Sequence, residues 1–157
     1  MKLQEALEII KKEFGKDSDG VKDIDPEGEK LICEHVKKKF GSDFVFLTHY
    51  PTTVRPPYTM PNDEKPNETN SFDLLFRGVE IATGGQRIHN HKQLIKSLEA
   101  RKMDPKNFKY YLEIFKYGMP PHGGWGMGSE RVAQKILGLK SIKEAVLYPR
   151  DVKRIVP

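Results

Sequence analysis

The ten residues from Gly123 to Val132 combine a glycine-rich stretch with a pair of charged side chains. Glycines alternate with larger residues at a period of two, which is typical of a strand with one face cleared of side chains. Glu130 and Arg131 follow at the point where the pattern becomes helical. An arginine beside a cleared surface suits a phosphate group, so the segment predicts a seat for a nucleotide. A short glycine-rich run has low specificity by itself.

A second group of polar side chains lies between residues 72 and 89. Asp73 and Glu80 are seven residues apart, so a regular strand would put them on opposite faces. A hairpin or bulge around Gly78 could bring them together. Two carboxylates and the Thr83 hydroxyl would then form an oxygen-rich site for Mg²⁺. Arg87 could clamp a carboxylate with two parallel hydrogen bonds. Surface ion pairs would explain the same residues equally well.

The bulk composition describes an ordinary globular chain of one domain's length. Its 157 residues are 37% hydrophobic and 31% charged, with a net charge of +5 that permits an anionic partner without requiring one. No apolar run approaches the roughly 20 residues of a membrane span, and we expect no leader and no membrane partner. The single cysteine, Cys33, excludes an intrachain disulfide. These features favour a cytoplasmic protein.

The elements that must position these side chains follow from periodicity and from Pro, Gly and Asp signals. Helices are predicted at residues 3–14, 26–40, around 94–98, from Pro105 to a stop at Gly118, and from 129 to near 138. Strands are predicted at residues 44–48, 72–76, 79–88 and 123–128, with a last extended piece at 146–149. A proline-rich, ordered or semi-ordered loop, rather than a domain linker, is predicted at 51–70. Without a βαβ rhythm, this order favours an α+β fold with a mixed, mainly antiparallel sheet flanked by helices.

Four segments in one collinear order carry a family resemblance: 72–89, 115–122, 123–132 and 147–154. Together they resemble the aspartyl-tRNA synthetases of the archaeal and eukaryotic type, over nearly the whole chain. The glycine segment is similar to motif 3 of the class II synthetases. The resemblance implies the class II catalytic fold, at least in part. It also implies aspartate–tRNA ligase activity, in which aspartate attacks the α-phosphate of ATP and the adenylate is then transferred to tRNA.

Site residues are implied by position. Arg131 matches the motif 3 arginine that binds the ATP phosphates, and Glu130 the acid before it, which would orient that arginine. The glycines that flank the adenosine are matched by Gly124, Gly126 and Gly128. The metal-and-ATP positions of the family are matched by Asp73, Glu80 and Thr83. The resemblance thus implies ATP as a substrate, Mg²⁺ as a cofactor, and Arg131 and Glu80 as the catalytic pair.

The resemblance implies an aspartate pocket at Gln86 and Arg87. Arg87 matches the family's arginine that binds the side-chain carboxylate of aspartate. His49 stands where the family commonly has a lysine, so a helper cation is lost or depends on pH. A related asparagine enzyme is less favoured, because an arginine clamp prefers a carboxylate to an amide. His49 keeps that alternative open. Trp125 could stack near adenine or be a buried strand residue.

Some parts of the family pattern are absent. We find no motif 1, no motif 2 and no anticodon-binding domain, so residues 1–157 are expected to be one domain, the C-terminal portion of a class II catalytic domain. We expect the isolated chain to have little or no enzymatic activity. Its expected partners are aspartate, tRNA, and either a missing catalytic half or further copies of itself in a homo-oligomer. An incomplete sheet would expose edges and apolar faces, which predicts self-association or poor solubility. The alternative is a non-catalytic synthetase-like paralogue that binds nucleotide or RNA.

Overall fold

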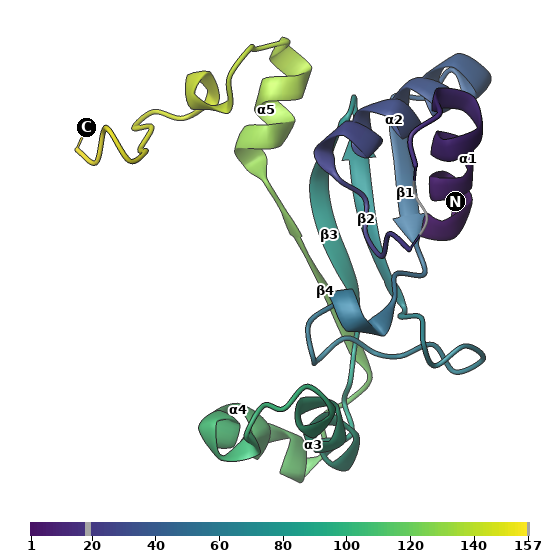
Figure 1. Ribbon diagram of the computed structural model, residues 1–157. Helices are drawn as coiled ribbons and strands as arrows, with labels where there is room; N and C mark the ends of the chain where they lie inside the picture. Colours follow the sequence, from purple (N-terminus) through teal and green to yellow (C-terminus); the bar gives the residue numbers. More distant parts are fainter. Residues whose placement is uncertain (18–19, 157) are drawn as a thin grey trace.

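A four-stranded antiparallel sheet, in the order β1-β2-β3-β4, forms the centre of the computed structural model, which describes residues 1–17 and 20–156 (Figure 1). The strands are β1 (Phe44–Thr48), β2 (Ser71–Phe76), β3 (Val79–Arg87) and β4 (His122–Met127). The helices are α1 (Leu3–Phe14), α2 (Pro26–Phe40), α3 (His91–Ala100), α4 (Lys109–Glu113) and α5 (Ser129–Leu137). The predicted α+β class with an antiparallel sheet is confirmed.

Helices α1 and α2 cover one face of the sheet at one end. Asp25 caps α2 by accepting a hydrogen bond from the Gly28 amide, with Pro26 at the first helical position. The apolar stripes of both helices pack on alternate residues of β1 and β2, and this core contains Leu3, Leu7, Ile10, Ile32, Val36, Val45, Leu47 and Leu75. Burial of each large apolar side chain contributes about 1.5–3 kcal/mol. The two helices are therefore fixed by a dry core.

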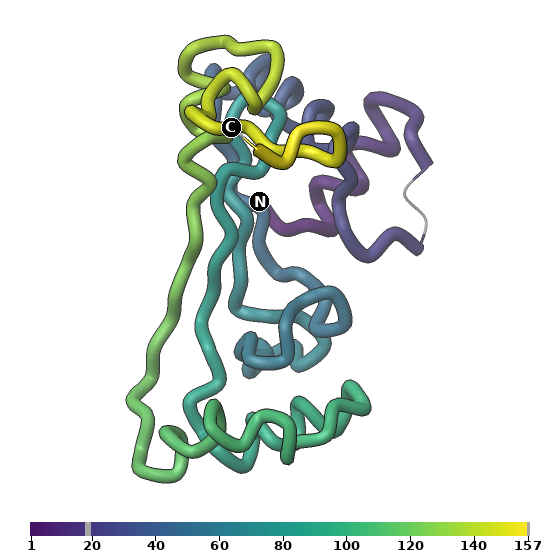
Figure 2. The backbone as a smooth tube through the Cα atoms, turned by 90° about the vertical axis from the view of Figure 1, so that its left-hand side faces the viewer, coloured from purple at the N-terminus to yellow at the C-terminus, as the bar shows by residue number. Residues whose placement is uncertain are grey.

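The other end of the sheet is surrounded by loops and short helices. Figure 2 shows the 51–70 loop and the segment from α3 to α4 at this end, far from the C-terminal segment. The loop is ordered, as predicted, with a 3-10 turn at Thr52–Val54 and bridges from Pro51 to Glu68 and from Pro61 to Thr69. A second apolar cluster, which includes Ile88, Leu94 and Leu112, holds the helices here.

Two predicted elements differ in the structure. The helix expected from Pro105 to Gly118 is divided into a 3-10 turn at Pro105–Phe108, the short α4 and a second 3-10 turn at Ile114–Tyr117. Leu112 and Phe115 are three residues apart, and a 3-10 turn keeps such residues on one side, where both are buried. Residues 146–149 form no strand.

The sheet face opposite α1 and α2 is open. Large apolar side chains on this face are exposed: Phe44, Phe46, Trp125 and Met127. Apolar patches of this kind promote association between molecules, so the expected self-association stays a prediction. None of the described helices is both long and apolar enough to cross a bilayer.

Candidate functional site

A bulge in the β2–β3 hairpin brings the two predicted carboxylates to one face. Asp73 pairs directly with Thr83, whereas Glu80 pairs with Leu75 after a register shift between Leu74 and Leu75. The shift leaves Ile81 as an extra residue on β3. One extra residue reverses the alternation of faces, so Glu80 returns to the side of Asp73 and Thr83. The predicted bulge is confirmed, and it lies within three residues of Gly78.

Arg55, from the proline-rich loop, ties this face together. Its Nη2 lies 2.8 Å from Asp73 Oδ2, and its Nη1 donates a hydrogen bond to Thr83 Oγ1 at 3.2 Å. The guanidinium also lies 3.6 Å from the ring centre of Tyr50, in cation–π contact. The side chains of Arg55 and Asp73 are only 13% and 7% exposed. An ion pair this buried strongly fixes the direction of the carboxylate.

Sequence reasoning missed Arg55 as a site residue. A signal was present, because Arg55 is the only charged residue between Pro51 and Asn62. Glu29 of α2 was missed as well, and it accepts a hydrogen bond from the Glu80 backbone amide at 2.8 Å. No local pattern distinguishes Glu29 from the other charged residues of that helix, since the contact spans 51 residues of sequence.

The acids at this end of the hairpin influence one another. Burial raises the pKa of Glu80 above its ordinary value, and the negative charge of Asp73 raises it further, against Arg131 and Arg55. Burial also raises the pKa of Glu29, partly offset by the Glu80 amide. Carboxylates that are costly to ionise gain most from a cation, so this group favours a positively charged ligand.

Arg131 lies in the first turn of α5 and reaches back to β3. Its Nη1 donates to the Glu80 carbonyl oxygen at 2.7 Å and lies 3.5 Å from Glu80 Oε1. Nearly half of its side chain is exposed, so part of the guanidinium remains available to a phosphate. Glu130 instead accepts a hydrogen bond from the Ser129 hydroxyl at 3.0 Å. The carboxylate in contact with Arg131 is therefore that of Glu80.

The glycines of β4 clear the same face that carries Asp73 and Thr83. Gly124 pairs with Gly85 and Gly126 pairs with Thr83, so both face the site side. A Cβ on Gly124 would lie 2.8 Å from Arg87 Nη2, whereas one on Gly126 would meet nothing within 4 Å. The face is therefore open at Gly126, where a flat group could lie, and tightly packed at Gly124, where the Arg87 side chain lies. A surface free of side chains is thus present, as the alternation predicts.

A cavity of about 370 Å³ lies next to the carboxylates and contains the predicted carboxylate clamp. The lining includes Arg55, Tyr58, Thr83, Gln86, Arg87, Gly124 and Gly126. The Arg87 guanidinium lies 5.3 Å from the ring centre of Tyr58, which orients it by cation–π contact. The Gln86 side chain accepts a hydrogen bond from Asn70 at 2.9 Å. The cavity therefore joins Arg87 to Thr83 through one continuous surface.

Three sequence-predicted residues lie elsewhere or face away. His49 is not among the residues that line this cavity, and its Nδ1 lies 2.8 Å from the Thr48 hydroxyl. Trp125 pairs with Gly84, which alternates in face with Gly124, and is 65% exposed, so the buried alternative is wrong. The residue still contributes to the lining of the cavity. Gly128 caps the start of α5 and packs against the Arg131 side chain.

The donor set at Asp73 fits a magnesium ion that is shared with a phosphate. Asp73 Oδ1 is fully buried and has no hydrogen-bond partner among the described residues. Across residues 1–17 and 20–156, no three His, Cys, Asp or Glu side chains are grouped closely enough to hold a metal ion. Mg²⁺ in nucleotide sites takes one or two carboxylates and completes its shell with phosphate and water. Asp73, Glu80 and Thr83 supply oxygen donors of that kind, and Arg55 already contacts Asp73 Oδ2 and Thr83 Oγ1.

The arrangement has an anion-binding group toward each end of β3. At one end, Arg131 and the carboxylates suit a polyphosphate with its cation, and at the other end Arg87 suits a carboxylate. The glycine-cleared strand runs between them. This geometry suits the transfer of a nucleotidyl group to a bound acid, a reaction whose acceleration depends on positioning and charge neutralisation.

Comparison with known families and proteins gives one consistent result. The model for class II tRNA synthetases (D, K and N) matches residues 1–152. The aspartate–tRNA(Asp/Asn) ligase of Thermus thermophilus is 51% identical over 153 residues, which is 98% of this chain and 35% of the relative. The aspartate–tRNA(Asp) ligase of Pyrococcus horikoshii is 45% identical, over 97% and 34%. The chain spans about a third of the length of the curated relatives it matches.

Solved structures agree with these sequence matches. The aspartyl-tRNA synthetase of Entamoeba histolytica superposes with a TM-score of 0.94 at 37% identity, covering 100% of this chain and 32% of that one. The asparaginyl-tRNA synthetase of Pyrococcus horikoshii, complexed with asparaginyl-adenylate, superposes with a TM-score of 0.89 at 28% identity, over 99% and 35%. The open cavity and the cleared strand thus lie in a fold that these two proteins share.

Proposed function

Because this chain belongs to the class II tRNA synthetase family (D, K and N), we propose that it supplies part of an aspartate-activating ATP site. The proposed reaction is aspartyl adenylate formation followed by transfer to tRNA. One observation carries the proposal: a single sheet face joins the Arg131–Glu80 pair to the Arg87 cavity through Thr83 and Arg55. We also propose a cytoplasmic site of action, where ATP and tRNA are available.

The phosphates of ATP would bind between β3 and α5. Arg131 is held by the Glu80 carbonyl and would contact the phosphates with its exposed nitrogens. A bound Mg²⁺ would neutralise phosphate charge and favour departure of pyrophosphate. Asp73, Glu80 and Thr83 would hold that ion, with Arg55 fixing the Asp73 carboxylate. Gly124, Gly126 and Gly128 would leave room for the adenosine.

Aspartate would be bound through its side chain by Arg87, with Gln86 beside it. Two-pronged pairing with a guanidinium selects a carboxylate over an amide. The substrate's other carboxylate would then face the α-phosphate along the cleared strand. Attack by that carboxylate oxygen on the α-phosphorus forms the adenylate and releases pyrophosphate. The chain contributes orientation and positive charge to this step.

The test separates binding from chemistry. Isothermal titration with ATP–Mg²⁺ and with aspartate should give weak binding of both to the 157-residue chain. Arg131→Ala should lose ATP and keep aspartate, while Arg87→Met should lose aspartate and keep ATP. Because each variant is the control for the other, a shared loss of both ligands would indicate misfolding.

Chemistry is tested by complementation. We expect aspartate-dependent pyrophosphate exchange only when the chain is mixed with the remaining two thirds of the Thermus thermophilus relative, expressed without its matching third. Exchange by the 157-residue chain alone at ordinary synthetase rates would contradict the need for a second part. Tight RNA binding without ATP binding would favour the non-catalytic paralogue. Asparagine should not replace aspartate.

A further inference from the structure

The turn that joins β2 to β3 contains a non-glycine residue, Arg77, in the left-handed backbone conformation that favours glycine or asparagine. Arg77 and Gly78 both have positive φ, at 47° and 82°, as in the two-residue hairpin turn of type I′. Asn-Gly is the usual pair at these positions, and a residue with a larger side chain is strained there. A strained side chain at a fixed position is a reason to look for a role.

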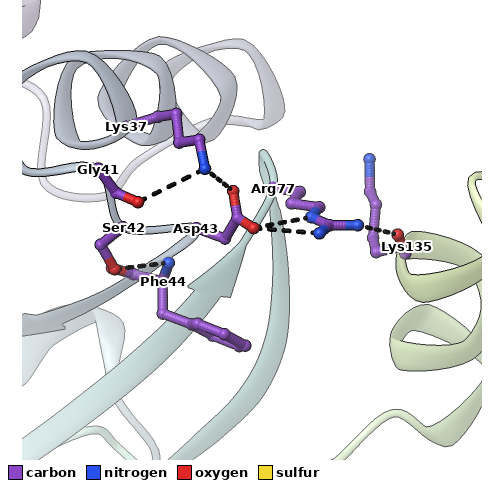
Figure 3. A network of polar contacts seen from close by, with 7 residues as sticks. All are labelled: Lys37, Gly41, Ser42, Asp43, Phe44, Arg77 and Lys135. Carbon is purple, nitrogen blue, oxygen red and sulfur yellow. Dashed lines mark hydrogen bonds and ion pairs between the residues drawn. The ribbon is translucent and has the colours of Figure 1, made fainter.

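Arg77 connects the hairpin to two other parts of the chain (Figure 3). Its Nε and Nη2 donate to Asp43 Oδ2 at 3.2 and 3.0 Å, while its Nη1 donates to the Lys135 carbonyl oxygen at 3.1 Å. The second Asp43 oxygen lies 3.0 Å from Lys37 Nζ at the end of α2. The guanidinium therefore spans from the start of β1 to the last turn of α5.

Helix α5 places no side chain in the core: residues 132–135 are half-buried and the others are exposed. Its N-cap residue, Gly128, provides no side-chain cap. At that end the Gly128 amide donates to the Ile81 carbonyl at 2.9 Å, and Arg131 donates to Glu80. Lys135 lies in the last turn, where carbonyl groups lack donors within the helix and the helix dipole is negative. A guanidinium suits that position.

We propose that Arg77 is a positioning residue for Arg131. Both ends of α5 are attached to the β2–β3 hairpin, one through Glu80 and Ile81 and the other through Arg77. A helix of nine residues is about 13 Å long, so release of one end lets it turn about the other. Arg131 would then lose its direction toward the phosphates. The role of Arg77 in binding rests on the proposed function, whereas the attachment of α5 does not.

The test replaces Arg77 without weakening the turn. Arg77→Asn removes the guanidinium and supplies the residue that a type I′ turn prefers, so the melting temperature should stay the same or rise. We expect the amides from Val132 to Leu137 to exchange with deuterium about tenfold faster, as expected for a lost charge-assisted hydrogen bond. The dissociation constant for ATP–Mg²⁺ should rise about threefold to tenfold.

Two further variants complete the experiment. Lys37→Met removes the outer contact of Asp43 and the 3.4 Å hydrogen bond from Lys37 to the Gly41 carbonyl. Neither contact involves α5, so both readouts should stay unchanged. Arg77→Lys can reach one of the two acceptors and should restore part of the α5 protection. Unchanged exchange in Arg77→Asn overturns the attachment, and faster exchange with unchanged ATP affinity overturns the positioning role. If the wild-type chain binds no ATP, the proposed function fails, and the exchange result alone decides the attachment.

Discussion

Helices α2 and α5 both contact β3 beside the same carboxylates, yet they are held by different forces. Helix α2 buries a stripe of side chains in the core and brings Glu29 to the Glu80 amide. Helix α5 buries no side chain fully, and polar contacts at its two ends bring Arg131 to Glu80. Side chains on α2 therefore contribute to stability, whereas those on α5 contribute to the site.

The largest expected effect is on the stability of the protein, from a substitution in the core stripe of α2. Ile32→Ala on α2 removes a side chain that is 0% exposed, and should lower the free energy of unfolding by about 2–5 kcal/mol. Ile136→Ala on α5, where the side chain is 61% exposed, should change it by about 0.5 kcal/mol or less. Urea denaturation measures both. Equal losses would mean that α5 is packed as α2 is.

A comparable loss is expected at the buried ion pair between Arg55 of the 51–70 loop and Asp73 of β2. Arg55→Ala leaves the buried Asp73 carboxylate without its partner and should lower the free energy of unfolding by about 3 kcal/mol. Arg55→Lys keeps the charge but not the fork that reaches both Asp73 and Thr83, so it should lose less. Thermal and urea unfolding serve as readouts. A neutral Arg55→Ala variant would show that the pair contributes no stability.

Arg131 should show the opposite behaviour from Ile32. Arg131→Ala should weaken ATP–Mg²⁺ binding about tenfold or more, because it removes charge-assisted contacts to phosphate. Its free energy of unfolding should stay within about 0.5 kcal/mol of the wild type, since the side chain is half-exposed. Calorimetry and urea denaturation on the same preparation separate the two effects. Loss of stability equal to that of Ile32→Ala would contradict the distinction.

The smallest effect concerns pH. The folded pKa of Glu80 is raised above its ordinary value of 4.5, so the folded state binds this proton more tightly than the unfolded state. The contribution of Glu80 to stability should therefore grow as pH falls through the raised pKa toward 4.5, and be lost as pH rises. Binding of ATP–Mg²⁺ should change in the opposite direction, because the metal needs the ionised carboxylate.

Glu80→Gln is the control for both pH effects. It cannot ionise, so the part of each pH dependence that belongs to Glu80 should disappear, while Glu29, whose pKa is also raised, keeps its own part. Unfolding and ATP titrations between about pH 4.5 and pH 8 provide the measurement. Identical pH profiles for Glu80→Gln and the wild type would show that Glu80 contributes to neither pH dependence.

Helices and strands could be predicted from the sequence where a single short-range pattern determines the secondary structure. The apolar stripes of α1 and α2 and the cap at Asp25 predicted helices at residues 3–14 and 26–40, and the structure has them there. The alternation of glycines predicted the cleared face of β4. Between Pro105 and Gly118 the same reasoning was wrong about the type of helix, because an apolar spacing of three residues is compatible with both an α-helix and a 3-10 turn.

The sequence by itself determined the residue types of the site, the antiparallel α+β class and the family to which the chain belongs. It could not decide whether Asp73 and Glu80 lie on the same face of the sheet, because the bulge at Ile81 determines the face on which Glu80 lies. It also did not reveal Arg55, Glu29 or Arg77 as neighbours of the site. Arg55 stood out locally as a lone charge, but no local pattern identified its partners or those of the other two residues, because these contacts depend on how distant segments pack. Only the tertiary structure decided those pairs.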